Sequence, residues 1–180
     1  DVFGVSMGGM IAQEMAVRNP DRISRLILGA TSPGGDAQVL APPEVQAYLE
    51  PRLDLTLHEA LWWGAPAGFP QEFIGANPDI VERKVQANMA YPSSLDAYLA
   101  QLDAYRAFDI GDRISEISAP TLVIAGDSDI LIPPENGRIL AENIPGAEFC
   151  EIEGAGHLFW ISHPNETYSA VAGFLEGNET

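Results

Sequence analysis

Three short apolar runs and one mixed apolar and acidic stretch along the chain predict β-strands. The first is the stub Val2-Phe3, and the second is Arg25-Leu26-Ile27-Leu28-Gly29-Ala30. The third, Thr121-Leu122-Val123-Ile124-Ala125, is continuously apolar, which is typical of a parallel strand buried on both faces. The fourth predicted strand is Ala147-Glu148-Phe149-Cys150-Glu151-Ile152, which mixes apolar and acidic residues. These runs predict the strands of a predominantly parallel sheet.

Apolar side chains at helical spacing predict helices after three of these runs. Residues 7–18 form the first helix, and Asn19-Pro20 ends it. The second runs from about Pro134 to Asn143 and the third from about Pro164 to Leu175. This order predicts an α/β layer with right-handed crossovers and helices on both faces of the sheet. The inner face of the last helix is expected to carry Tyr168, Val171, Ala172 and Leu175.

Residues 36–110 differ, because they predict helices separated by Pro and Gly and no strand. Asn77-Pro78 is typical of an N-cap followed by proline at the first helical position. Ser93 and Asp96 match a capping box that opens another helix. One face of that helix is predicted to carry Leu95, Tyr98, Leu99, Leu102 and Tyr105.

Composition and charge exclude several classes of protein. With 180 residues, 46% of them hydrophobic, the chain is large enough for one globular domain with a core. No run of about eighteen apolar residues occurs, so no membrane span is expected. The net charge of -17 argues against nucleic acid and anionic membranes as partners. These features leave the oligomeric state open.

Cys150 is the only cysteine, which excludes an internal disulfide and a metal site built from cysteines. Its place in the predicted strand 147–152 favours a small buried hydrophobe. No signal-like segment opens the chain at Asp1. The lack of disulfides favours a cytoplasmic location.

Ser6 is the leading candidate for a nucleophile. It is the central residue of Gly4-Val5-Ser6-Met7-Gly8, a Gly-x-Ser-x-Gly motif between a strand-like stub and a predicted helix. This context is typical of a nucleophile elbow, where the serine lies on a strained turn and the residues two positions away must be small. The helix start offers free N–H groups to a developing oxyanion, and we expect the Met7 N–H to be one donor.

A serine nucleophile needs a histidine base, and that histidine needs a carboxylate to fix its tautomer. Of the three histidines, only His157 follows directly after a predicted strand. Sites in α/β sheets form at the carboxyl ends of strands, so His157 is the predicted base. His58 and His163 are expected to be surface or packing residues.

The carboxylate is expected after the preceding strand, where Gly126-Asp127-Ser128-Asp129 offers two candidates. Aspartate readily bonds to its own backbone in turns, so we expect one of the two to make a turn and the other to orient His157. Either choice gives the chain order Ser, Asp, His. That is the order of α/β-hydrolases, and it differs from the orders in the chymotrypsin and subtilisin folds.

The chain resembles the α/β-hydrolase superfamily over nearly its whole length. The resemblance is carried by the nucleophile elbow and its continuation, the strand and loop of the acid, and the histidine loop with the start of the last helix. These segments are Val2–Met10, Asn19–Ile23, Pro120–Asp129, and Gly154–His157 with His163–Glu166. The family places its acid three residues after the glycine of the acid strand, so the resemblance favours Asp129 over Asp127.

The resemblance implies an α/β-hydrolase fold in two parts. Residues 1–35 and 111–180 would form the core, and residues 36–110 a helical cap over the site. Aromatic side chains of the cap would line an apolar substrate pocket. The candidates are Trp62, Trp63, Phe69 and Tyr98, with Phe73 and Tyr105 as further ones.

Members of this family have further strands and a glycine-rich loop ahead of the elbow, and that loop supplies a second oxyanion N–H. The elbow of this chain already stands at Ser6. We therefore expect the chain to be the C-terminal portion of a longer member, with the N-terminal strands missing. Expressed alone, it is expected to fold poorly and to be essentially inactive, because a central strand edge would be unpaired.

These residues predict a serine hydrolase that cleaves a carboxylic ester or lactone, with a small apolar molecule as substrate. Ser6 would attack the carbonyl, His157 would carry the proton and Asp129 would hold His157; no metal or cofactor is expected. A C–C bond hydrolase and a cofactor-free haloperoxidase-like enzyme are alternatives that keep the triad. A non-catalytic ligand receptor, or an inactive fragment, is the alternative of another class.

Overall fold

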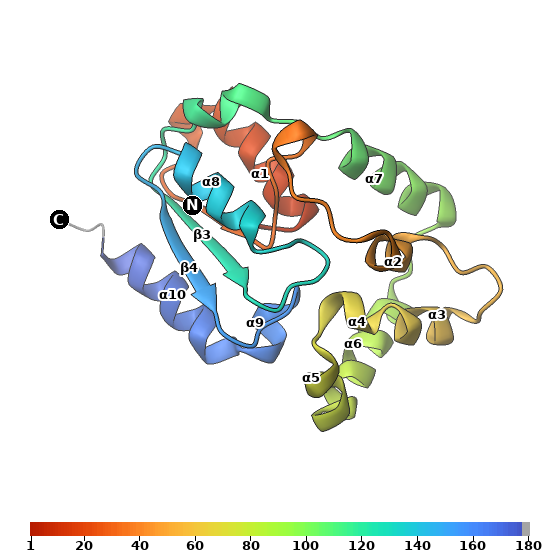
Figure 1. Cartoon of the computed structure of the whole chain (residues 1–180). Coiled ribbons are helices and arrows are strands. Elements are labelled where there is room, and N and C mark those ends of the chain that lie inside the picture. The colour runs from red at the N-terminus through yellow and green to blue at the C-terminus, as the bar shows by residue number, and fades with distance from the viewer. Residues whose placement is uncertain (178–180) are drawn as a thin grey trace.

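The computed structural model describes residues 1–177, in which a parallel sheet lies between two layers of helices (Figure 1). Within these residues four strands pair in chain order, and every pairing is parallel. The four segments predicted as strands are confirmed. The strands are β1 (Val2–Val5), β2 (Leu26–Gly29), β3 (Thr121–Gly126) and β4 (Glu148–Ile152).

Helices and short 3-10 turns connect the strands. The α-helices are α1 (Met7–Arg18), α2 (Pro43–Gln46), α3 (Leu57–Trp63), α4 (Ala65–Gly68), α5 (Gln71–Ala76), α6 (Pro78–Ala90), α7 (Leu95–Ala107), α8 (Glu135–Asn143), α9 (Phe159–Ser162) and α10 (Pro164–Glu176). The 3-10 turns are η1 (Pro20–Arg22), η2 (Gly35–Ala37), η3 (Ala47–Leu49) and η4 (Gly111–Glu116). The helices predicted after the first, third and fourth strands are confirmed as α1, α8 and α10. The short helix α9 was not predicted.

Alternate residues of the central strands face opposite layers of helices. Leu26 and Leu28 belong to a core cluster that includes side chains of α1 and α8. Ile27 and Ile124 belong to a second cluster, with side chains of α9 and α10. Every residue of β2 and β3 is buried. Because both faces of these strands are covered, their sequences are continuously apolar and do not alternate.

The predicted inner face of α10 is wrong at Tyr168, whose side chain is 73% exposed. The helix faces the sheet with Thr167, Val171 and Phe174, which are spaced i, i+4 and i+7. Consecutive helical residues point about 100° apart, so this spacing turns Tyr168 toward solvent.

The predicted start and apolar face of α7 also need correction. The N-cap is Ser94, whose hydroxyl accepts a hydrogen bond from the Ala97 N–H over 3.2 Å. Ser94 directly precedes the first helical residue, and Ser93 lies one position too early for that role. Leu95 and Leu99 are exposed, and Leu102 is the buried residue of this helix.

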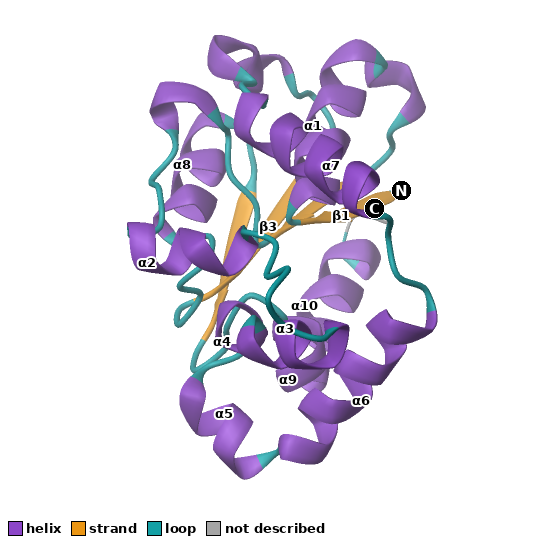
Figure 2. Ribbon diagram, turned by 90° about the vertical axis from the view of Figure 1, so that its right-hand side faces the viewer, coloured by secondary structure: helices purple, strands orange, loops and turns teal. Residues whose placement is uncertain are grey.

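The chain between β2 and β3 is helical, and its two ends meet. Gly34 and Asp109 form an antiparallel bridge. A Cβ on Gly34 would lie 2.1 Å from the Phe108 carbonyl oxygen, so this close approach requires glycine. Helices α3 to α6 lie together, apart from α1 and α8 (Figure 2), and bury a small cluster around Phe69 and Val81.

The two flanking glycines of the serine motif differ in the room that each has for a side chain. A Cβ on Gly4 would lie 2.3 Å from the Gly8 carbonyl oxygen and 2.8 Å from the Ala12 Cβ. A Cβ on Gly8 would meet no described atom within 4 Å. The prediction that both positions must be small is therefore confirmed for Gly4 and wrong for Gly8.

We expect Gly4→Ala to lower the free energy of unfolding by roughly 1–3 kcal/mol, because the added methyl forces β1 and α1 apart. Gly8→Ala is the matched control, since it adds the same methyl to the same motif at a point where it meets no described atom within 4 Å. It should be neutral, or stabilise helix α1 by up to about 1 kcal/mol. Urea unfolding of both variants of the full-length protein measures the difference, and equal losses would contradict the steric account.

Candidate active site

Ser6 lies on the turn between β1 and α1 in a backbone conformation that is rare for a residue with a side chain. Its φ is 55° and its ψ is -124°, a strained geometry that costs of order 1–3 kcal/mol. The Ser6 N–H donates to the Gly29 carbonyl over 2.8 Å. The Thr31 hydroxyl donates to the Ser6 carbonyl, also over 2.8 Å. Strand β2 and the loop after it therefore hold the predicted strained turn in place.

Asp129 and His157 form a buried pair in the loops that follow β3 and β4. The His157 Nδ1 lies 2.8 Å from the Asp129 Oδ2, and the Asp129 side chain is 0% exposed. The other carboxylate oxygen accepts hydrogen bonds of 2.9 Å from the backbone N–H groups of Leu131 and Ile132. With the carboxylate as acceptor, the Nδ1 carries the proton, which leaves the Nε2 able to accept one.

Asp127 has a different set of contacts. Its Oδ1 accepts a hydrogen bond of 2.8 Å from the Gly154 N–H and so joins the acid loop to the histidine loop. The two loops approach closely, because a Cβ on Gly126 would lie 2.2 Å from the Ala155 carbonyl oxygen. Of the two candidate aspartates, Asp129 is therefore the one that contacts the imidazole, and Asp127 is the one that holds the turn.

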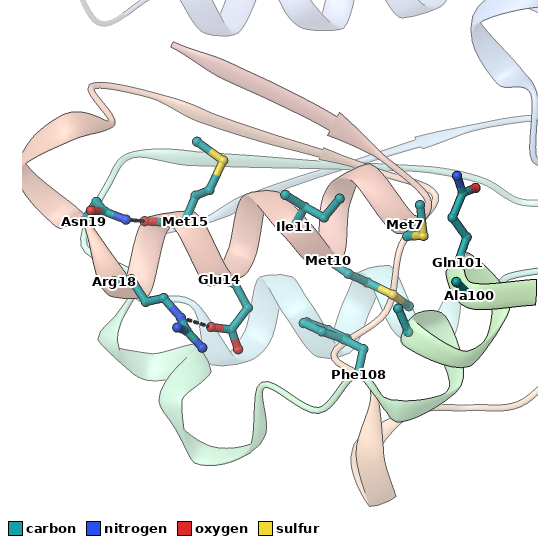
Figure 3. A pocket seen from close by; sticks show the side chains of 11 residues that line it. Met7, Met10, Ile11, Glu14, Met15, Arg18, Asn19, Ala100, Gln101 and Phe108 are labelled. Carbon is teal, nitrogen blue, oxygen red and sulfur yellow. Dashed lines mark hydrogen bonds and ion pairs between the residues drawn. The ribbon is translucent and has the colours of Figure 1, made fainter. Parts of the chain in front are cut away.

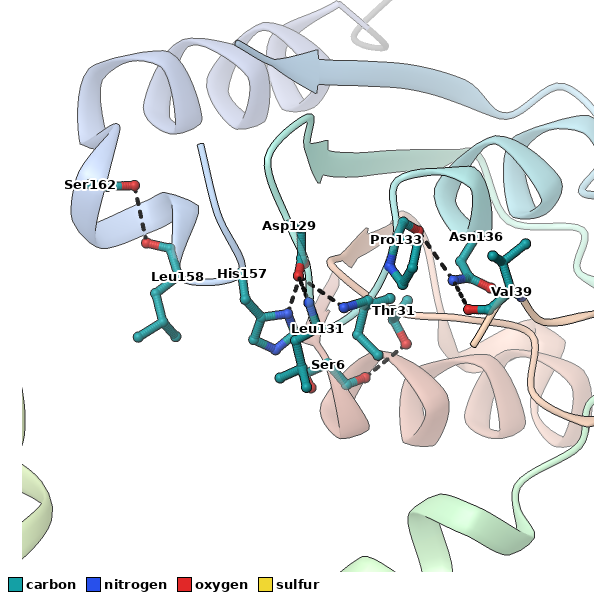
Figure 4. Close-up of polar contacts among 11 residues, drawn as sticks. Ser6, Thr31, Val39, Asp129, Leu131, Pro133, Asn136, His157, Leu158 and Ser162 are labelled. Atoms are coloured by element: carbon teal, nitrogen blue, oxygen red, sulfur yellow. Dashed lines mark hydrogen bonds and ion pairs between the residues drawn. The ribbon is translucent and has the colours of Figure 1, made fainter. Parts of the chain in front are cut away.

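Ser6 and His157 line adjoining cavities at one edge of the sheet. Ser6 and Met7 line a cavity of about 170 Å³, and His157 lines a larger one of about 840 Å³. Figure 4 shows that Ser6, Asp129 and His157 come from three separate loops. Among the described residues no hydrogen bond joins the Ser6 hydroxyl to the imidazole; such bonds are often long without a substrate. The walls common to both cavities are Leu49, Tyr98, Gln101 and Leu131.

Met7 is the first residue of α1, so its backbone N–H has no acceptor within the helix. It lines the small cavity together with Ser6. The positive end of the helix dipole is directed at this point. An oxygen that gains negative charge beside Ser6 would therefore find a donor there.

Three of the four principal aromatic candidates line the larger cavity, namely Trp63, Phe69 and Tyr98. The prediction is wrong for Trp62. Its indole N–H donates to Glu82 over 2.7 Å, and its ring packs in the apolar cluster of α3 to α6. Because neighbouring helical residues point about 100° apart, Trp62 and Trp63 face different surroundings.

Two tyrosines of α7 line the cavity beside Ser6. The Tyr98 hydroxyl donates to the Leu49 carbonyl over 2.7 Å. Burial raises the pKa of Tyr98, and the charge of Glu50 raises it further. Burial also raises the pKa of Tyr105, with a contribution from the nearby Asp129 carboxylate. Both phenols therefore stay protonated at neutral pH, so neither is available as a base there.

The remaining candidates are engaged elsewhere. The His58 imidazole lies 3.1 Å from Glu82, and His163 lies 2.8 Å from the Ser162 hydroxyl. Cys150 is half-buried in β4, and burial raises the pKa of its thiol.

Within residues 1–177 no group of His, Cys, Asp or Glu side chains is arranged to hold a metal ion. No described helix combines the length and apolar character needed to cross a bilayer.

A further cavity, of about 510 Å³, lies between α1 and α7 (Figure 3). Its walls are mostly apolar, and they include no histidine. The charged residues Glu14 and Arg18 in its wall pair with each other over 2.6 Å. Met7 also lines this cavity, but neither Asp129 nor His157 does, so we assign it no part in a reaction at Ser6.

The sequence reasoning did not identify the residues that hold the catalytic candidates in position. Thr31 donates a hydrogen bond to the Ser6 carbonyl, although it lies 25 positions away in the sequence. The backbone N–H groups of Leu131 and Ile132 donate to the Asp129 carboxylate because of the local conformation of the loop. No composition or spacing signal marks Thr31, whereas the aspartate two residues before Leu131 was a recognisable turn signal.

Residues 1–164 match the sequence profile described as alpha/beta hydrolase fold, so the chain belongs to this family. The predicted family and fold class are confirmed. The solved enol-lactonase of Burkholderia xenovorans LB400 is 26% identical, with a TM-score of 0.79. That comparison covers 97% of this chain and 64% of the lactonase.

Two curated relatives match almost the whole of this chain. A poly(3-hydroxyalkanoate) depolymerase of Ectopseudomonas oleovorans is 31% identical over 98% of this chain and 60% of its own length. RutD of Rhizobium rhizogenes, a candidate carbamate hydrolase, is 30% identical over 97% of this chain and 66% of its own length. The chain thus spans 60% to 66% of the length of these relatives.

Proposed function

We propose that the chain carries the triad of a serine hydrolase that cleaves a carboxylic ester or lactone through an acyl-enzyme. Ser6 attacks the carbonyl carbon while the His157 Nε2 takes the hydroxyl proton, and Asp129 holds the imidazole. The Met7 N–H binds the developing oxyanion. His157 then returns the proton to the leaving alcohol. In the second half of the reaction water attacks the acyl-enzyme, with His157 again as the base.

The observation that carries this proposal is the buried hydrogen bond between Asp129 and His157. A carboxylate without solvent contact costs free energy unless it is fully hydrogen-bonded. Here two backbone donors hold it and direct its second oxygen at the imidazole. Such a pair, in a loop beside a serine with strained backbone, suits general base catalysis better than a packing role.

We further propose that residues 36–110 form a cap over a core of residues 1–35 and 111–180, of which residues 178–180 lie outside the described part. The bridge between Gly34 and Asp109 supports this, because it closes the segment at its base. The Leu158 N–H donates to the Gly68 carbonyl over 2.9 Å and so ties the segment to the histidine loop.

A carbamate is a second candidate substrate class, favoured by the similarity to RutD. The test is a panel of nitrophenyl esters, lactones, carbamates and C–C cleavage substrates offered to the full-length protein. We expect an ester or lactone to be hydrolysed with a burst of product as the acyl-enzyme forms. If the protein turns over only a carbamate or only a C–C substrate, the bond that it cleaves is not an ester or lactone bond. Ligand binding without turnover of any substrate would contradict the hydrolase proposal and favour a receptor.

A further inference from the structure

Lys84 is the single lysine of the chain, and it lies in the wall of the larger cavity, which His157 also lines. It belongs to α6, where Val81, Val85 and Asn88 line the same cavity. These positions are spaced i, i+3, i+4 and i+7, so they form one face of the helix. Lys84 is half-buried on this face, between two fully buried valines.

The Lys84 ammonium has no carboxylate partner among the described residues. Its Nζ donates to the neutral Asn88 side chain over 2.8 Å. Burial lowers the pKa of Lys84, because the cost of removing the charge from water is not offset by an opposite charge. A cation without a partner is unexpected in a chain of net charge -17, where acidic side chains outnumber basic ones.

Among the residues that the structure describes, the other acidic and basic side chains on the cavity wall already have partners. Glu50 pairs with Arg106, and Arg52 pairs with Asp54. The Arg52 guanidinium also lies 4.8 Å from the centre of the Trp63 ring. Among the described side chains of this cavity, Lys84 is therefore the cation that is free to bind an anion from solution.

We infer that Lys84 binds a carboxylate carried by the substrate while the scissile carbonyl lies at Ser6, so that the enzyme prefers anionic esters or lactones. The inference rests on the proposed hydrolase function. A cavity of about 840 Å³ has the size of typical small-molecule sites. Much of the remaining wall is apolar, including Trp63 and Phe69, so a carboxylate bound elsewhere in it would lose its hydration without compensation. Lys84 would thus decide which end of the substrate enters the cavity.

The test compares two nitrophenyl esters in the full-length protein. One has an acyl chain that ends in a carboxylate, and the other is the matched primary amide of equal length. We expect the wild type to prefer the carboxylate, and Lys84→Met to lower kcat/KM for it by about 10- to 100-fold. Most of the loss should fall on KM, because the contact is made equally in the ground state and the transition state. Lys84→Arg should retain part of the preference.

Arg83→Met is the matched control, because Arg83 is exposed on the same helix and pairs with Asp79. It should leave both esters unaffected. The inference is overturned if Lys84→Met lowers turnover of both esters equally, or of neither, while fluorophosphonate still labels the protein. If neither ester is cleaved and no labelling occurs, the hydrolase proposal itself fails and the inference fails with it.

Discussion

Ser6→Ala is expected to abolish covalent labelling of the full-length protein by a fluorophosphonate and to lower kcat by about 10⁶-fold. The hydroxyl is the proposed nucleophile, and the other hydroxyls described in the small cavity, Tyr98 and Tyr105, have raised pKa values. The fold should be unaffected, because alanine occupies the same backbone conformation at φ 55° with no greater steric conflict than serine. Labelling measured by mass spectrometry, together with steady-state kinetics, tests this expectation.

Ser115→Ala is a suitable control for the labelling experiment. Its hydroxyl is exposed and donates to the Asp112 carbonyl over 2.9 Å, well separated in sequence from the motif. This variant should label and turn over like the wild type. Labelling that persists in Ser6→Ala would show that the nucleophile is another residue.

Asp129→Asn is expected to lower kcat by about 10⁴-fold while the protein stays folded. The reason lies in the two oxygens of the carboxylate. One accepts from the N–H groups of Leu131 and Ile132, so the amide oxygen of asparagine must take that place. The amide NH₂ then faces the His157 Nδ1, which must become an acceptor. The ring proton moves to the Nε2, and the base is lost.

Asp127→Asn provides the matched control, with the same change two residues away. Its amide oxygen can still accept from the Gly154 N–H, so the contact between the two loops is kept. We expect kcat to be unchanged and urea unfolding to be close to that of the wild type. If Asp127→Asn lost most of its kcat and Asp129→Asn lost none, Asp127 would be the residue that orients His157, and the assignment made here would be wrong.

Local patterns predicted the larger features of the fold. Apolar runs identified the two central strands, since strands buried on both faces cannot contain exposed polar positions. The glycines around Ser6 marked a strained turn, and Gly4 is indeed closed to a side chain by the Gly8 carbonyl. These signals are short in range, because each depends on residues within one turn or one strand.

Orientation around a helix was predicted less well. Trp62 was assigned to the cavity, but only its neighbour Trp63 lines it. Tyr168 was assigned to the inner face of α10, but its neighbour Thr167 is the buried residue. In an isolated sequence the direction of a helix face is known only to within about one residue, or 100°. The partner against which the helix packs sets the final direction, and that partner is remote in sequence.

The sequence by itself determined the α/β class, the strained serine turn and the order Ser, Asp, His, because these follow from local pattern and chain order. The residue types alone did not decide whether Asp127 or Asp129 orients His157, and the family resemblance favoured Asp129. Only the tertiary structure decided which carboxylate contacts His157 and which joins two loops. It alone brought Lys84 into a cavity with His157. Such contacts join residues far apart along the chain, so they exist only once strand register and helix packing are set.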